Sequence, residues 1–421
     1  MTDHIPLFIL IAIVLLVLDY YIYSGIIKGL RLRKGSVKAF GFFFWCFSFF
    51  LIAGLFLSIF VKLSVGIRAA ILMAFFLTFA GKVLFLPFLF GDDIRRLFVW
   101  RTRTKAAVEI AEKSSPTFTA IPRSEFLVKA GLLAGSLPIA TLAYGTLKGV
   151  YDYRLRKQVL YLPNLPKQFD GLTLGQLSDI HAGSFSDHKA VAVGVELLMR
   201  EKPDLIFFTG DLVNDRAYEM YGYQDIFSKV KAPLGVFSSL GNHDYGDYSY
   251  RWLPGAKEKN HADLIQTHKN MGWNLLQNEN RRIKVGGEEI GILGCENWGT
   301  LSRFPKYGRM DLTTKDTADL PVKLLLSHDP SHWDAEIRPK YGNIDVTFAG
   351  HTHGMQFGVR TKEIQWSPIE YVYEEWAGLY KKGAQQLYVN VGYGFLGYPG
   401  RVGILPEVTI FELRSSLEPD F

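Results

Sequence analysis

Cysteine is nearly absent from this 421-residue chain, which contains only Cys46 and Cys295. Cys46 lies in an apolar run and Cys295 in a strand-like segment, so the sequence has no disulfide framework, and the cysteines do not reveal the compartment. The apolar runs near the N-terminus show neither an internal repeat nor a cluster of polar residues. The chain is long enough for a soluble domain and a second region.

An excess of basic residues is also missing from most of the chain, although the net charge is +6. Residues 1–150 carry 17 basic and 7 acidic side chains, a net charge of +10, whereas residues 151–421 carry 30 basic and 34 acidic side chains, a net charge of −4. The larger C-terminal part therefore lacks the basic surface that binding to nucleic acid requires, and we expect no nucleic-acid partner.

Four apolar runs dominate the first part of the chain, at residues 5–23, 40–61, 69–90 and 130–150. The first three have about the length that a helix needs to cross the hydrocarbon core of a membrane. The fourth run is weaker because it contains several glycines and Pro138. Buried core helices are the alternative, which the length and the Phe, Leu and Ile content of the runs disfavour. The sequence therefore predicts an all-α transmembrane region of about four helices over residues 1–150.

The charges between the apolar runs predict how they are oriented. Basic side chains follow the first run and again the third, so both loops are expected to face the cytoplasm. They are Lys28, Arg31, Arg33, Lys34 and Lys38 in the first loop, and Arg95, Arg96, Arg101, Arg103 and Lys105 in the second. If residues 130–150 span the membrane, residues 151–421 lie outside the cytoplasm, and if they do not, these residues are cytoplasmic.

Residues 122–129, before the fourth run, bear on which side of the membrane residues 151–421 lie. They resemble a twin-arginine export signal but have only Arg123 where two arginines are expected. Arg154, Arg156 and Lys157 follow the fourth run and argue weakly against export. We expect residues 151–421 to be extracytoplasmic.

Two charged residues interrupt the apolar runs, Asp19 and Lys82. A charge inside a membrane segment suggests a functional site, but pairing between helices is the favoured interpretation here. A transporter with an accessory enzyme domain remains the weaker alternative. The stretch from Asp92 to Lys113 is predicted to form either a basic helix on the inner leaflet or a solvated loop.

From Tyr161 onward, strand-like and helix-like segments alternate. Strands are predicted at residues 172–180, 205–209, 234–240, 273–276, 281–285 and 289–293, and helices at residues 188–200, 218–230 and 261–271. This order indicates βαβ crossovers first and antiparallel hairpins later, and two packed sheets flanked by helices would fit it. Right-handed crossovers would bring the first three strand ends to one edge of a sheet.

Polar residues cluster where these strands end. The clusters are Asp179-Ile180-His181, Gly210-Asp211, Gly241-Asn242-His243-Asp244 and Gly350-His351-Thr352-His353, and His328 follows a further apolar segment. Ligands gather at strand ends in open α/β sheets. A carboxylate can bridge two cations, an amide adds a neutral oxygen, and imidazoles add neutral nitrogens. Each cluster by itself could be a chance pattern, a common turn or an ordinary histidine. Chance is a poor explanation for the whole ordered set.

This order of motifs resembles the calcineurin-like metallophosphoesterases, whose pattern is D-x-H, G-D, G-N-H-[DE], H and G-H-x-H. The resemblance covers about residues 160–415 and is greatest to a bacterial membrane-anchored branch, which residues 387–390 and 401–408 also resemble. It implies a four-layer αββα sandwich over residues 151–421, in an integral protein of a bacterial inner or plasma membrane. Gly354-Met355 departs from the Gly-Gly that is frequent in this branch, which affects the expected substrate contact and not the metals.

The resemblance also implies a role for each motif residue. One metal ion would be held by Asp179, His181, Asp211 and His353, and the other by Asp211, Asn242, His328 and His351. His243 would protonate the leaving oxygen, with Asp244 orienting it. Mn²⁺, Fe²⁺ or Zn²⁺ would suit these mixed ligands better than Ca²⁺ or Mg²⁺.

The implied activity is hydrolysis of a phosphomonoester, phosphodiester or pyrophosphate bond by a metal-activated hydroxide. A phosphorylated small molecule or a lipid-linked envelope compound is the expected substrate. A catalytically idle receptor or scaffold with the same fold is the alternative, which the intact ligand set disfavours. The aromatic-rich segment 356–382 is predicted to be a substrate wall or lid, a lipid contact, or a satellite apolar cluster. The sequence does not indicate the oligomeric state.

Overall fold

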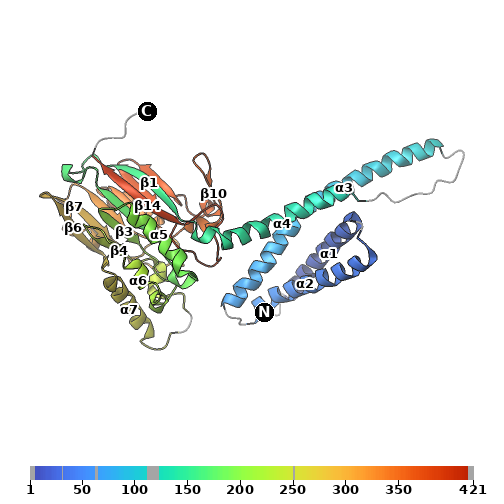
Figure 1. The fold of residues 1–421 in the computed structure, drawn as a ribbon, viewed down its shortest axis with the longest axis horizontal. Helices are drawn as coiled ribbons and strands as arrows, with labels where there is room; N and C mark the ends of the chain where they lie inside the picture. The colour runs from blue at the N-terminus through green and yellow to red at the C-terminus, as the bar shows by residue number, and fades with distance from the viewer. Residues whose placement is uncertain (1–4, 31, 62–64, 111–122, 250–251, 416–421) are drawn as a thin grey trace. The chain divides into compact units, whose positions relative to one another are not determined.

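The computed structural model describes residues 5–30, 32–61, 65–110, 123–249 and 252–415 (Figure 1). The chain divides into two compact units, Met1–Ala143 and Tyr144–Phe421. We call them the helical unit and the catalytic unit. Each has its own core.

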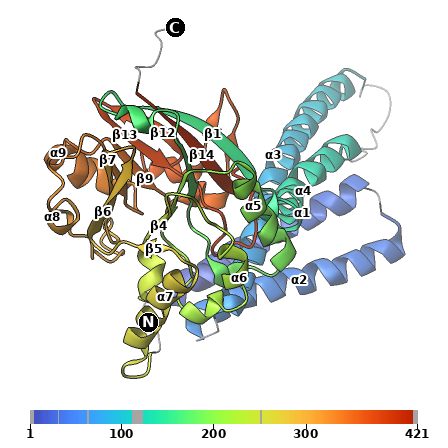
Figure 2. The ribbon, with the colours of Figure 1, turned by 60° about the vertical axis from the view of Figure 1, so that its left-hand side comes forward.

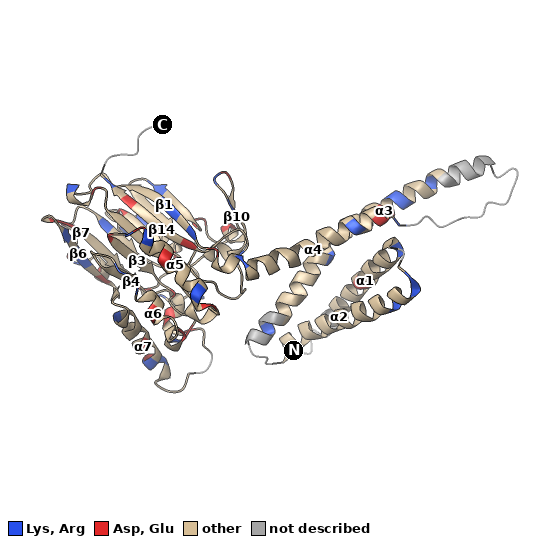
Figure 3. Ribbon diagram, viewed as in Figure 1, with Lys and Arg blue, Asp and Glu red and all other residues tan. Residues whose placement is uncertain are grey.

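The helical unit is built from α1 (Ile5–Leu30), α2 (Lys34–Phe60), α3 (Val65–Ile110) and most of α4 (Glu125–Leu147). Four segments are long and apolar enough to cross a membrane, namely Ile9–Leu30, Lys34–Ser58, Ile71–Thr102 and Glu125–Tyr151, and the last begins with α4 and continues past its end at Leu147. The prediction of an all-α region of about four such helices is confirmed. Figure 3 shows basic residues at the turn between α1 and α2 and on the second half of α3.

The helix α3 is longer than the predicted third run. It continues without a break to Ile110, so residues 92–110 are helical, as one of the two predicted alternatives has it, and do not form a loop. Residues 111–113 of the predicted segment lie outside the described residues. Arg and Ala favour helix in this stretch. Asp92 pairs with Arg95, and Asp93 pairs with Arg96, at the helical i,i+3 spacing.

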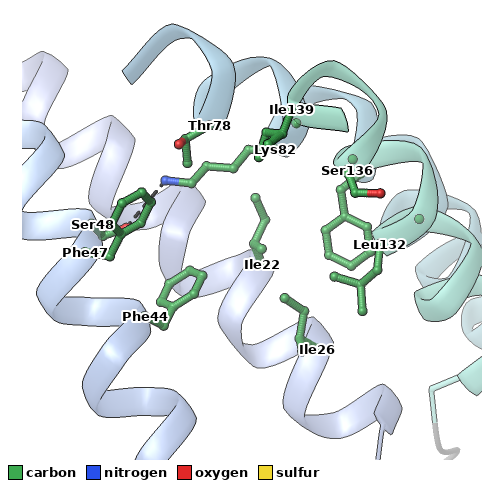
Figure 4. Close-up of a pocket in the computed structure, with 14 residues that line it drawn as sticks. Ile22, Ile26, Phe44, Phe47, Ser48, Thr78, Lys82, Leu132, Ser136 and Ile139 are labelled. Atoms are coloured by element: carbon green, nitrogen blue, oxygen red, sulfur yellow. Dashed lines mark hydrogen bonds between the residues drawn. The ribbon is translucent and has the colours of Figure 1, made fainter. Parts of the chain in front are cut away.

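The two charged residues of the apolar runs form an ion pair between helices. Lys82 Nζ of α3 lies 2.5 Å from Asp19 Oδ1 of α1, and Ser48 of α2 donates a hydrogen bond to the same carboxylate. Lys82 and Ser48 border a hollow of about 310 Å³ that is lined mainly by apolar residues (Figure 4). The favoured interpretation of Asp19 and Lys82, pairing between helices, is confirmed.

The residue that suggested an export signal has a structural role. Arg123 is 8% exposed and lies 3.5 Å from Asp92 Oδ2 and 3.1 Å from Asp93 Oδ1. Asp92 also accepts a hydrogen bond from the backbone N–H of Ser124 at the start of α4. These contacts join the beginning of α4 to the middle of α3.

Two six-stranded sheets make up the catalytic unit. The first has the order β1 (Arg154–Tyr161), β14 (Glu407–Arg414), β2 (Thr173–Leu177), β3 (Leu205–Thr209), β4 (Val236–Ser239) and β5 (Asn274–Leu275). The second has the order β12 (Gly378–Lys382), β13 (Gln385–Val389), β9 (Val346–Ala349), β8 (Lys323–Leu326), β7 (Glu288–Gly294) and β6 (Glu279–Val285). A small ribbon pairs β10 (Val359–Arg360) with β11 (Gln365–Trp366).

Most neighbouring strands in both sheets are parallel, including β2–β3–β4 and β7–β8–β9. Parallel strands point their carboxyl ends in one direction, so the loops that follow them gather at one edge. The antiparallel pairs are β14 with β2, β12 with β13 and β6 with β7. The predicted combination of crossovers and hairpins is therefore present.

The sheets pack face to face, and helices cover their outer faces (Figure 2). The first sheet is covered by α5 (His188–Arg200), α6 (Gln224–Phe227) and α7 (Ala256–Asn270), and the second by α8 (Met310–Thr313) and the helical turn Trp333–Ile337, which α9 (Arg338–Lys340) follows. Every residue of β3 is buried, since Ile206 and Phe208 belong to the core that includes α5 residues, while Leu205 and Phe207 pack between the sheets. The ring of Phe207 lies 5.1 Å from that of Phe348 in β9. The predicted four-layer αββα sandwich is confirmed.

Two local predictions differ from the structure. Residues 218–230 form a 3-10 turn at Ala217–Met220 and the short α6, because Gly222 interrupts the helical pattern between them. The strand β1 begins at Arg154, before the first strand that the sequence predicts, and pairs in parallel with β14 near the other end of the chain. Its partly exposed positions do not show the simple alternation by which strands are recognised.

Candidate metal centre

The predicted metal ligands lie on loops that leave the carboxyl ends of parallel strands in both sheets. They are Asp179 and His181 after β2, Asp211 after β3, Asn242 after β4, His328 after β8, and His351 and His353 after β9. The loops interlock, since the backbone N–H of His351 lies 3.0 Å from each carboxylate oxygen of Asp179. The site is therefore built where the edges of the two sheets meet.

Asp179, His181 and His353 form the first group. Each offers one ligand atom, and these atoms lie within 4.8 Å of one another. His353 Nε2 is 3.3 Å from Asp179 Oδ1, and His181 Nε2 is 3.5 Å from Asp211 Oδ2. All of these side chains are buried.

Asp211, His328 and His351 form the second group, whose ligand atoms also lie within 4.8 Å of one another. His328 Nε2 is 3.1 Å from Asp211 Oδ2, and His351 Nδ1 is 2.7 Å from Asn242 Oδ1. The same Asp211 oxygen thus lies beside an imidazole of each group. This is the position that a carboxylate bridging two cations requires.

Unpartnered nitrogen atoms show that the first group fits a metal ion. Both ring nitrogens of His181 and Nε2 of His353 are buried and have no hydrogen-bond partner in the part of the chain that the structure describes. Leaving a buried polar atom unsatisfied costs about 1–3 kcal/mol, and a cation would remove that cost. Burial lowers the pKa values of His181 and His351, which favours the neutral form that ligates metals.

The charges of the second group fit a metal ion as well. Burial by itself would lower the pKa of His328, but the adjacent Asp211 carboxylate outweighs it and raises this pKa to about 10. Burial would likewise raise the pKa of Asp211, but the neighbouring imidazoles, His328 first, hold it well below its usual value. The pair thus binds a proton tightly, and a divalent cation between the same atoms would replace it.

Backbone conformation marks the same residues. The φ angles of Asp179, His181, Asp211, His351 and His353 are 52°, 49°, 60°, 71° and 51°. Residues with a side chain rarely adopt this left-handed region, at a cost of about 1–3 kcal/mol each, and such strain clusters at functional sites. At Gly241, an added Cβ would collide with the Asp211 carboxylate, so this close approach requires glycine.

The proposed ligands are oriented by partners that the motifs do not contain. His328 Nδ1 donates to the Thr209 carbonyl at 2.7 Å, which directs Nε2 to Asp211. His351 Nε2 lies 2.9 Å from the Tyr373 hydroxyl, which donates to Asp329 at 3.4 Å. Such partners fix ring orientation and tautomer in metal sites. Sequence reasoning missed Asp329, although it directly follows His328.

Arg401 is a further residue whose role the sequence did not show. Its side chain is completely buried, its Nη2 atom lies 3.1 Å from His353 Nδ1, and it donates to the carbonyls of Val391 and Gly394. It therefore joins the loop after β13 to the first metal-binding group. No local pattern around Arg401 predicts this long-range contact.

The expected contact between Asp244 and His243 is corrected by the structure. His243 Nδ1 lies 2.7 Å from the carbonyl of Asn214, which is therefore the group that orients the ring. The Asp244 carboxylate instead accepts hydrogen bonds from the backbone N–H groups of Asp211, Leu212 and Gly241, at 2.8–2.9 Å. It holds together two loops that carry proposed ligands. Burial and the Asp211 charge raise its pKa to about 7.

A hollow of about 350 Å³ opens beside the centre. Its lining includes His243 together with Tyr248, Arg303, Phe304, Ile369, Tyr373 and Leu396. In the aromatic segment, Tyr373 and Trp376 are buried in a small apolar cluster, as one alternative predicted, whereas Ile369 and Tyr373 also line the hollow. The segment is thus both a satellite core and a wall of the site.

Comparison with known proteins agrees with this geometry. Residues 172–355 match the family model described as "Calcineurin-like phosphoesterase", and residues 5–150 match the model described as "Probable Calcineurin-like phosphoesterase, transmembrane domain". An uncharacterized metallophosphoesterase of Bacillus subtilis (strain 168) is 29% identical over 256 residues, which are 60% of this chain and 82% of that protein.

Two other relatives match to a similar degree. A phosphodiesterase of Escherichia coli (strain K12) is 29% identical over 242 residues, which are 56% of this chain and 80% of that protein. A transmembrane protein with a metallophosphoesterase domain from Danio rerio is 24% identical over 347 residues, covering 79% of this chain and 71% of that protein. The last match extends into the helical unit, because the aligned length exceeds that of the catalytic unit.

Proposed function

We propose a function for a chain that belongs to the calcineurin-like phosphoesterases and is a metal-dependent phosphoester hydrolase of membranes. Its metal centre holds two divalent ions, and the enzyme acts outside the cytoplasm. The observation that carries this proposal is the position of Asp211 Oδ2, 3.5 Å from His181 Nε2 and 3.1 Å from His328 Nε2.

The proposed ligand sets follow the two groups. Asp179, His181, Asp211 and His353 would hold one cation, and Asp211, Asn242, His328 and His351 the other. Their mixed nitrogen and oxygen atoms favour Mn²⁺, Fe²⁺ or Zn²⁺. When bound, such a pair of ions lowers the pKa of water toward neutrality and offsets the negative charge of a phosphate.

His243 is the proposed general acid. Its Nδ1 atom is engaged with the Asn214 carbonyl, so Nε2 remains for a proton transfer in the hollow. Its backbone N–H donates to Asp211 Oδ1 at 2.9 Å, which fixes the residue against the proposed bridging carboxylate. A charged His243 would give its proton to the oxygen that leaves phosphorus.

We place the domain boundary at about residue 150, with a membrane anchor before it and the phosphoesterase domain after it. Four candidate spans and basic residues after α1 and within α3 favour a catalytic unit outside the cytoplasm of a bacterial inner or plasma membrane. The name of the Escherichia coli relative makes a phosphodiester the first substrate to test. A lipid-linked or envelope phosphoester would be available to an enzyme placed there.

The test uses the full chain in detergent, stripped of metal by a chelator and then given Mn²⁺, Fe²⁺, Zn²⁺, Ca²⁺ or Mg²⁺. We expect hydrolysis of bis-p-nitrophenyl phosphate to return with one of the first three ions and less with the last two. If no ion restores hydrolysis of this diester, of p-nitrophenyl phosphate or of pyrophosphate, the receptor or scaffold alternative is favoured.

A further inference from the structure

We propose that Arg303 binds the substrate's phosphoryl group, and that the site therefore favours a phosphoryl group with two negative charges, as in a phosphomonoester or a terminal pyrophosphate. This inference rests on the proposed phosphoesterase function and names the substrate class of the same site. Arg303 belongs to none of the motifs, and it is exposed on the loop that follows β7.

The loop around Arg303 is held in place by Asn297. Asn297 Nδ2 donates to the carbonyl of Pro305 at 2.7 Å, and the Asn297 carbonyl accepts hydrogen bonds from the backbone N–H groups of Tyr307 and Gly308 at 2.8 Å and 3.1 Å. These bonds close the loop on itself. Arg303 is thus carried by a fixed turn.

Phe304 places this turn against the metal centre. Its ring meets the ring of His351 edge-on, with 4.6 Å between the ring centres. The guanidinium carbon of Arg303 lies 4.7 Å from the centre of the Phe304 ring. Both residues line the hollow together with His243, Asn242 and Asp211. The guanidinium is therefore attached to the wall that faces the second metal-binding group.

Among the described residues, Arg303 has no carboxylate partner: none forms an ion pair with it, no hydrogen bond to its side chain is found, and its guanidinium lies only against the Phe304 ring. It is also the one Lys or Arg that lines the hollow, within the part of the chain that the structure describes. A substrate anion in the hollow would be its first counter-charge.

The chemistry of phosphate esters decides which anion suits this arrangement. A diester has two non-bridging oxygens, which a pair of metal ions would engage. A monoester has a third terminal oxygen and a second negative charge, and a pyrophosphate has further oxygens on its second phosphorus. The planar guanidinium recognises such oxygens with short, charge-assisted hydrogen bonds. Phe304, Ile369 and Leu396 offer apolar surface to the organic group.

The experiment compares full-length wild type, Arg303→Ala, Arg303→Lys and Lys306→Ala in detergent with the activating metal. Lys306 is the matched control, since it is an exposed cation on the same loop whose Nζ lies over the Trp298 ring and not in the hollow. Two quantities are measured: KM and kcat for p-nitrophenyl phosphate and for bis-p-nitrophenyl phosphate, and the Kd of inorganic phosphate by calorimetry.

For Arg303→Ala we expect KM for the monoester and the Kd of phosphate to rise about tenfold or more, with less than about a threefold change for the diester. Arg303→Lys should recover part of the loss, and Lys306→Ala should match wild type. Equal effects of Arg303→Ala on both esters, or an unchanged Kd of phosphate, would overturn the proposal while leaving the phosphoesterase function intact. If wild type hydrolyses neither ester, the proposed function fails, and the Kd of phosphate still decides the role of Arg303.

Discussion

Among the described residues of the catalytic unit, three groups of ionisable side chains are compact enough to hold a cation, and they differ in the charges that already neutralise them. The first two, which meet at Asp211, consist of carboxylates and imidazoles, and some of the imidazole nitrogens have no hydrogen-bond partner among the described residues. The third is an acidic group of Asp334, Glu374 and Glu375. There, Lys382 Nζ lies 2.6 Å from Asp334 and 2.5 Å from Glu375.

This contrast shows why clustering by itself does not define a metal site. Lys382, together with Arg338 beside Asp334, provides the positive charge of the acidic group, so a divalent ion would have to displace a cation of the protein. At Asp211 the neighbours are imidazoles, which lose their charge and then ligate. Left-handed backbone at several proposed ligands is a further difference.

The largest expected effect comes from breaking the shared carboxylate. Asp211→Asn should lower phosphoesterase turnover by more than about a thousandfold, which exceeds the loss of a single electrostatic donor, because both proposed cations lose a charged ligand. Glu374→Gln, an 80% exposed member of the acidic group, is the control and should behave as wild type. Turnover with the activating metal measures the effect, and comparable losses in both variants would remove the distinction between the groups.

His243→Ala should lower turnover by about a hundredfold, because the leaving oxygen loses its proton donor. Metal content should not change, since His243 is not among the proposed ligands. Initial rates and metal analysis on the same preparation check this pair of outcomes. If metal is lost together with activity, His243 is a ligand or a support of one, and its assignment as acid is wrong.

Tyr373→Phe should weaken metal binding about tenfold, because it removes the hydroxyl that lies 2.9 Å from His351 Nε2 and keeps the ring. Tyr371→Phe is the matched control, since Tyr371 is 79% exposed. Titration of the stripped protein with the activating metal gives the affinities. Identical titration curves for the two variants would contradict the role of Tyr373 in orienting His351.

Glu407 extends the comparison to a buried carboxylate that the protein neutralises with arginines. Burial would raise its pKa, but Arg360 and Arg156 outweigh burial and lower it. A lowered folded-state pKa contributes stability above the unfolded value of about 4.5, and this stability is lost as the pH falls further. Glu407→Gln should destabilise the protein by about 3 kcal/mol at pH 7, since it leaves the arginines uncompensated, with no direct effect on chemistry.

Thermal unfolding of wild type and Glu407→Gln between pH 7 and pH 3 measures this contribution. The gap in stability between the two proteins should narrow as the pH falls through the lowered pKa, because wild-type Glu407 then becomes neutral as well. A gap that is the same at every pH would show that charge pairing at Glu407 is not the cause.

The residues that the sequence proposes as ligands lie together in the structure, because each motif combines a buried strand with the polar residues directly after it. Asp211 after β3 and His328 after β8 can be recognised from a few neighbouring residues. The partners of these side chains are distant in sequence and cannot be recognised in that way. The Asn214 carbonyl at His243 belongs to the backbone, and Tyr373 reaches His351 through an irregular segment.

Local sequence patterns also reveal α5 but not β1. α5 begins at His188 and ends at Arg200, as its apolar spacing predicts, and Asp187 caps it by accepting from the N–H groups of Lys189 and Ala190. The strand β1 has only one fully buried residue and is held by pairing with β14. Its existence depends on a partner more than two hundred residues away, which no local pattern reports.

The metal content of the purified full-length chain tests the central claim most directly. Elemental analysis after purification without chelator should find about two transition-metal ions per wild-type chain and fewer than about one in Asp211→Asn, with Glu374→Gln equal to wild type. Equal metal content in wild type and Asp211→Asn would contradict the claim that this carboxylate joins two cations.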